Sequence, residues 1–106
     1  RAKNEFPEAL AAYTEALDIY RRLAPSNPQA FLPDYAVTMV NLSIFHLQSQ
    51  PDKKASVELA TEVVVIALQF QHVPIVMQCE QTAIQVLQAW KVDVEAVLKE
   101  RGISLG

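Results

Sequence analysis

The stretch Ala55–Phe70, with the sequence ASVELATEVVVIALQF, decides the fold class of this chain. Its centre, Val63–Ile66, is a run of β-branched residues that on propensity alone predicts a buried strand. The apolar pattern, however, begins at Ala55 and continues at helical spacing without a turn residue, which is too long for such a strand. We therefore predict a helix from Lys53 to about Phe70, capped by Asp52. Because this helix is apolar on several sides, we expect it to be largely buried.

Prolines and caps divide the rest of the chain into further helical segments. Asn27 and Asp93 are predicted N-caps, and Gly102 is predicted to end the last helix. Pro33 removes one backbone hydrogen bond and crowds the preceding turn, so it is expected to begin a new helix. The predicted segments are a helix from Pro7 to about Leu23, a short helical turn at Pro28–Leu32, and helices from Pro33 to about Gln48, from Pro74 to about Trp90 and from Val94 to Arg101.

The composition fits about five helices joined by short connections. The 106 residues are 51% hydrophobic and 20% charged, which is typical of one globular domain. They include only two glycines, whereas a β-sandwich or barrel of this size needs a glycine-rich turn about every ten residues. Connections of about two to five residues place consecutive helices antiparallel. The sequence therefore predicts an all-α domain of antiparallel helical hairpins over residues 1–106.

The charge pattern excludes two classes of partner. The net charge is −3, and the largest basic clusters are the pairs Arg21-Arg22 and Lys53-Lys54. Phosphate recognition needs more clustered lysine and arginine than this. The longest uncharged stretch, Val63–Cys79, contains a proline, a histidine and three glutamines, which is unsuited to a membrane span. We therefore expect neither nucleic acid nor a membrane as partner.

Catalytic chemistry has few candidate residues in this chain. Cys79 is the single cysteine, and His46 and His72 are the two histidines. Cys79 falls on an apolar face, where thiols are usually inert, His46 is expected to be a structural histidine, and His72 lies in a loop with no ligand at metal spacing. The chain has no Ser-His-Asp, HExxH or glycine-rich phosphate motif. We expect no enzyme activity, cofactor or metal, with a thiol or metal enzyme as the alternative. A lone thiol fits a reducing cytoplasm.

One segment near the start resembles a known repeat family. In residues 5–17, EFPEALAAYTEAL, a small, an aromatic and a small residue stand at Ala9, Tyr13 and Ala16. This spacing resembles the second helix of a tetratricopeptide repeat (TPR). Small residues let the two helices of a hairpin approach closely, and the aromatic ring fills the gap to the next repeat.

The resemblance continues in weaker form to about residue 68. Leu42 matches the family's leucine, Ser43 stands where the family has glycine, and His46 stands where it has tyrosine. Ala55 continues the series, but it lies 46 residues after Ala9, beyond the usual 34. The pattern is similar to the long-helix variants of bacterial arrays. Residues 74–106 would form either a degenerate repeat or C-terminal capping helices.

The resemblance implies a short α-solenoid that acts as a non-catalytic scaffold for protein–protein interaction. In that family the first helix of each hairpin lines a concave groove, which binds a peptide or a partner domain. The chain begins at Arg1 without a methionine, and we expect it to be a piece of a longer protein.

Two surfaces are candidates for partner binding. Asn41 lies where peptide-binding repeats hold a ligand's backbone, but the basic residues of a carboxylate clamp do not accompany it. An apolar face around it favours a hydrophobic or helical ligand. Glutamine side chains on a second stripe can both donate and accept hydrogen bonds. The alternatives are that later helices cover the first face and that the second is ordinary solvent-facing surface. The residues are Val37, Val40, Asn41, Ile44 and Leu47 on the first, and Gln78, Gln81, Gln85 and Gln88 on the second.

A second hypothesis is self-association. In the register of the resemblance, the chain starts on the second helix of a hairpin whose first helix is absent. Leu10, Leu17 and the Ala9–Ala16 face would then lack a partner, and an exposed apolar face favours association. The interpretation predicts a homodimer through the unpaired N-terminal helix.

Overall fold

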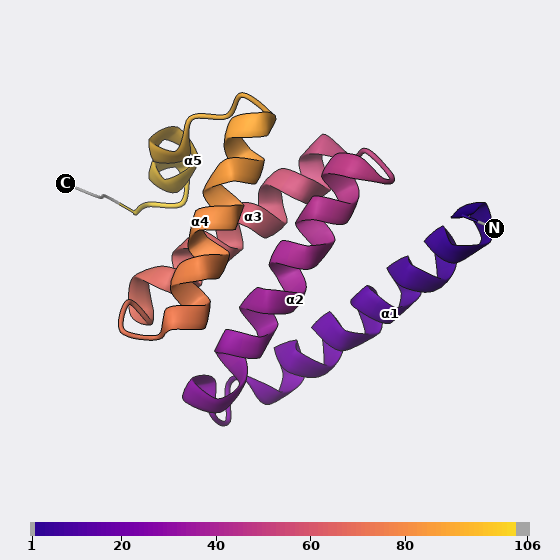
Figure 1. The fold of residues 1–106 in the computed structure, drawn as a ribbon. Helices are drawn as coiled ribbons and strands as arrows, with labels where there is room; N and C mark the ends of the chain where they lie inside the picture. The colour runs from indigo at the N-terminus through magenta and orange to yellow at the C-terminus, as the bar shows by residue number, and fades with distance from the viewer. Residues whose placement is uncertain (1, 104–106) are drawn as a thin grey trace.

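Five helices form the part of the chain that the computed structural model describes, residues 2–103, with side chains described for residues 7–103 (Figure 1). Successive long helices run antiparallel, so the prediction of an all-α fold built from helical hairpins is confirmed, and no strand occurs within these residues. The elements are α1 (Ala2–Leu23), α2 (Pro28–Gln48), α3 (Lys53–Gln69), α4 (Pro74–Ala89) and α5 (Val94–Glu100).

The valine run of α3 is helical, as its length predicted. Val63, Val64 and Ile66 are all at most 5% exposed. They are buried because α3 lies between α2 and α4 and also contacts α5. A helix covered by neighbours on several sides needs apolar residues on several sides, which explains a composition that resembles a buried strand.

The predicted break at Pro33 is wrong, and so is the predicted start of the first helix at Pro7. The helix α2 is continuous from Pro28, and α1 begins at Ala2, so each proline is the sixth residue of its helix. A proline there removes only one hydrogen bond, in the first turns. In α2 the carbonyl group left without that bond belongs to Gln29, an exposed residue whose backbone can bond to water.

Side-chain caps begin three of the helices, as predicted. The backbone N–H of Ala30 donates to Asn27 Oδ1 at 3.3 Å, and that of Ala55 donates to Asp52 Oδ1 at 3.1 Å. At the start of α5, the Glu95 N–H donates to the Asp93 carboxylate at 3.0 Å. These bonds satisfy N–H groups that have no partner within their own helix.

Two similar motifs end α4 and α5. After α4, Lys91 has φ +62°, and the Val92 N–H donates to the Leu87 carbonyl at 2.9 Å. After α5, Gly102 has φ +80°, and the Ile103 N–H donates to the Leu98 carbonyl at 2.9 Å. Both are Schellman ends, in which a left-handed residue reverses the chain. The helices of residues 74–89 and 94–100 are therefore separate.

We expect Lys91→Gly to raise the free energy of unfolding by about 0.5–1 kcal/mol, because glycine adopts a positive φ without steric cost. Gly102→Ala is the matched reverse change, and it should lower stability by a similar amount. A Cβ atom at position 102 would meet nothing within 4 Å, so its cost comes from the backbone alone. Urea titration measures the change in the free energy of unfolding for each of the two variants. A destabilised Lys91→Gly chain would contradict the role of this residue.

A chain of hydrogen bonds joins α2, α3 and Trp90 at the end of α4. The Ser56 hydroxyl donates to the Ser43 carbonyl oxygen at 2.7 Å, and it accepts a bond from Trp90 Nε1 at 2.8 Å. Both serines are 0% exposed. Ser56 is the fourth residue of α3, so its bond to the indole holds Trp90, which follows α4, against the beginning of α3. Trp90 is thus a structural residue that is held by a specific partner.

Candidate functional site: the hollow between α2 and α4

A small hollow lies between α2 and α4, two helices that are not consecutive in the chain but contact each other. Its volume is about 220 Å³. Its lining comes from two helical faces, in which residues recur three or four positions apart. On α2 these are Val37, Val40, Asn41 and Ile44, and on α4 they are Ile75, Gln78, Cys79 and Thr82.

The hollow has an apolar floor and a polar rim. Val40 and Cys79 are each 5% exposed and lie deepest. Ile75 is 46% exposed, so the hollow presents a large aliphatic side chain to solvent. Asn41 and Gln78 are exposed on the two helices, and neither side-chain amide bonds to another residue that the structure describes. The hollow can therefore receive an apolar group of a ligand, and the two side-chain amides can hydrogen-bond to the polar groups around it.

The structure brings together five of the nine candidate binding residues. Val37, Val40, Asn41 and Ile44 lie in the hollow with Gln78, so one member of the glutamine stripe joins the α2 face. The alternative that later helices cover the α2 face holds in part, because α4 packs beside it. The other four lie outside the hollow: Leu47 is half-buried and packs against the core, and Gln81, Gln85 and Gln88 are exposed on α4.

Three lining residues, Ile75, Cys79 and Thr82, are not among the nine candidates, and of these Ile75 is the large hydrophobic residue that is exposed. Ile75 lies four residues before Cys79, which falls on an apolar face, but the side chain of Ile75 is exposed. Val76, the next residue in the same turn, is 0% exposed, so Ile75 is at the surface because of the face of α4 on which it lies. A signal was present, since Ile75, Gln78 and Thr82 are spaced three and four apart and share one face.

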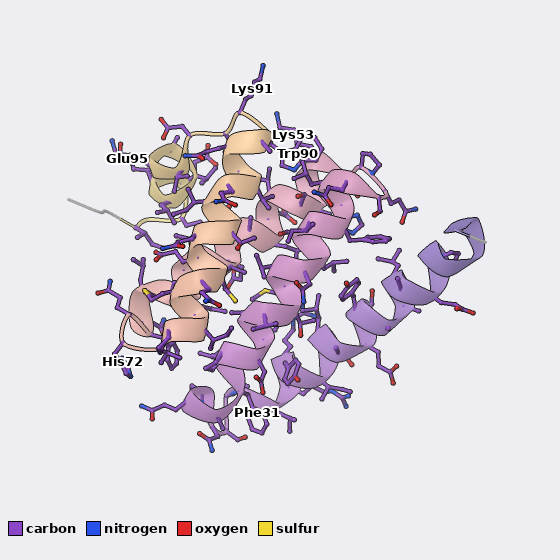
Figure 2. All side chains as sticks on the ribbon, in the orientation of Figure 1. Phe31, Lys53, His72, Trp90, Lys91 and Glu95 are labelled. Atoms are coloured by element: carbon purple, nitrogen blue, oxygen red, sulfur yellow. The ribbon has the colours of Figure 1, made fainter. Side chains whose placement is uncertain are left out.

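The candidates for catalytic chemistry lie in separate environments. Cys79 is in the floor of the hollow, whose lining includes neither histidine, and burial raises the pKa of its thiol. A higher pKa leaves less thiolate, which is the reactive form. His46 Nδ1 is 3.1 Å from the Gln50 carbonyl oxygen, and its ring packs edge-on against Phe45. His72 is exposed in the loop between α3 and α4, where Figure 2 shows it pointing outward.

No group of three or more His, Cys, Asp or Glu residues suited to a metal ion occurs within the part of the chain that the structure describes. In the same residues, every helix is too short or too polar to cross a membrane.

A wider hollow of about 550 Å³ is lined by residues of α1, α2 and α3 and by Arg101. Its rim carries charges of both signs, including Arg21, Glu58 and Glu62. Glu62 already pairs with Arg101, which also lines this hollow. Part of this charged lining is therefore already paired within the chain, whereas the hollow between α2 and α4 offers apolar surface and side-chain amides that bond to no other described residue.

Comparison of the chain with protein-family models, with curated proteins and with solved structures finds no match. The functional argument therefore depends on the geometry and chemistry of the chain itself.

Proposed function

We propose that this chain is a non-catalytic protein-interaction module that binds a peptide or a partner domain in the hollow between α2 and α4. The observation that carries the proposal is the exposure of Ile75 beside the apolar walls formed by Val37 and Ile44. A large aliphatic side chain at the edge of an apolar hollow gains free energy when a partner covers it.

The size of the hollow favours a side chain as its occupant. Sites for cofactors and drug-sized molecules usually measure about 300–1,000 Å³, which is larger than the 220 Å³ found here. We expect an apolar side chain of the partner to enter, with the amides of Asn41 and Gln78 bonding to the partner's backbone or polar flanks. A hydrophobic or helical segment supplies such a side chain.

The resemblance to TPRs supports the same surface. In its register α2 is the first helix of a hairpin, and α4 would be the first helix of the next one if residues 74–106 form a degenerate repeat. First helices line the groove in that family. The direct contact between α2 and α4 is compatible with this arrangement. We propose accordingly a short TPR-like α-solenoid without enzyme activity. The compartment we propose is the cytoplasm, where a lone reduced thiol such as that of Cys79 is usual.

The test is a selection of apolar peptides from a library, followed by mapping of amide chemical shifts in the labelled chain. We expect shifts to concentrate at Val37, Asn41, Ile44 and Gln78, and Ile75→Glu to weaken the selected peptide at least about tenfold, because it places a charge in the apolar contact.

Gln85→Glu is the matched control, since it adds the same charge to α4 outside the hollow. It should leave affinity within about twofold. Peptides that bind the chain with equal affinity after Ile75→Glu, or that shift only residues of other helices, would contradict the proposed site.

A further inference from the structure

The helix α1 lies at the edge of the fold and contacts only α2 among the described helices. Figure 1 shows its N-terminal half diverging from the remaining helices. The prediction that Leu10 and Leu17 lack a partner is wrong: Leu17 is 7% exposed, and Leu10 is half-buried against the core. The reason is that α2 packs on this face, with the rings of Tyr13 and Phe45 6.0 Å apart.

A neighbouring face of α1 is the one that stays uncovered. Ala12, Ile19 and Leu23 are exposed, and Ala16 between them is half-buried. These four residues are spaced four, three and four apart, so they form one stripe along the helix. Ile19 and Leu23 are 39% and 40% exposed, and Ile75 is the only other large hydrophobic residue so exposed in the described part of the chain. We call these four residues the α1 stripe.

We propose that a second copy of this chain covers the α1 stripe, with the two α1 helices packed antiparallel about a two-fold axis. The spacing of four and three is the one by which two helices pack side chains into each other's gaps. The stripe is small at one end and large at the other. In the antiparallel orientation Ala12 faces Leu23 of the second copy, and Ala16 faces Ile19 of the second copy. Each large side chain then meets a small one, which fills space without a clash.

The charges beside the stripe complement each other in the same orientation. Glu15 and Arg22 are seven residues apart, so they flank the stripe on one side, one near each end. Antiparallel pairing brings Glu15 of each copy opposite Arg22 of the other. This makes two equivalent ion pairs, each between a negative and a positive side chain. Arg22 lies 3.4 Å from Asp18 on its own helix, but both side chains are more than half exposed. Such a pair is weak and can rearrange.

This inference is independent of the proposed ligand hollow, because the α1 stripe and the hollow share no residue. The first test is sedimentation of the 106-residue chain over a range of concentrations. We expect a monomer–dimer equilibrium and a dissociation constant that rises about a hundredfold or more in Ile19→Glu, since the dimer would bury two unpaired carboxylates. Ile75→Glu is the control, because it makes the same change at another exposed isoleucine, which lies outside the stripe. It should leave dimerisation unchanged.

The second test fixes the orientation. Glu15→Arg and Arg22→Glu should each weaken the dimer about tenfold, since each turns two attractive pairs into repulsive ones. The double variant Glu15→Arg/Arg22→Glu exchanges the two charges and should restore the wild-type constant. In a parallel dimer these residues would not face each other, so the single reversals would have no effect. Three results would each overturn the proposal. They are single charge reversals that have no effect, a wild-type chain that stays monomeric at high concentration, and a dimer that is insensitive to Ile19→Glu.

Discussion

Leu98→Ala is expected to lower the free energy of unfolding by about 3 kcal/mol, because it removes a fully buried leucine and leaves a cavity. Leu98 is 0% exposed and is the one buried residue of the seven-residue helix α5. An isolated helix of that length is unstable in water, so α5 depends on packing against α3 and α4. We therefore expect amide hydrogens of residues 94–101 to exchange much faster in the variant, and urea titration to report the loss of stability.

Val97→Ala serves as the control for this prediction. Val97 is in the same helix but is only half-buried, so its truncation should cost less than about 1 kcal/mol. If Leu98→Ala were no more destabilising than Val97→Ala, α5 would not be anchored by Leu98.

Ser56→Ala is expected to lower the free energy of unfolding by about 2 kcal/mol, although it removes a single oxygen atom. The Ser56 hydroxyl accepts from Trp90 Nε1 and donates to the Ser43 carbonyl, so its loss leaves the indole N–H without this partner and removes the second bond of a carbonyl that lies within α2. Trp90 is the only tryptophan, and its fluorescence reports its own environment. We expect a lower unfolding midpoint together with a change in the emission of the folded state.

Two further variants isolate this contribution. Ser49→Ala removes an exposed hydroxyl at the end of α2 and should change stability by no more than about 0.5 kcal/mol. Trp90→Phe combined with Ser56→Ala completes a double-mutant cycle, which should give a coupling energy of about 1 kcal/mol. A coupling energy near zero would show that the indole and the hydroxyl act independently.

Local chemistry allowed most of the fold to be predicted from the sequence. The length of the apolar pattern identified α3 as a helix despite its valine run, and Asn27, Asp52 and Asp93 each cap the helix that follows. The errors at Pro7 and Pro33 arose because a proline was treated as a boundary. The position of a proline in its helix decides how many hydrogen bonds it removes and whether water can replace them. Its effect on the helix depends on both.

The candidate site could be predicted only in part, since periodicity identifies a face of a helix but not the neighbour that covers it. Four residues of one α2 face do line the hollow. On α4 the rotation of the helix against α2 brings in Gln78, leaves Gln81, Gln85 and Gln88 outside, and adds Ile75. The exposure of Ile75 depends on which face of α4 the neighbouring helices cover, since Val76 beside it is 0% exposed, and that coverage is a tertiary property.

The central position of α2 has a consequence for affinity. This helix separates α1 from α4, so the α1 stripe and the ligand hollow lie on different helices (Figure 1). A dimer through α1 would therefore carry two unobstructed hollows in one particle. A partner with two copies of the recognised segment would bind the second at a high effective concentration once the first is bound. Weak single sites would then give strong binding to repetitive or dimeric partners and weak binding to single segments.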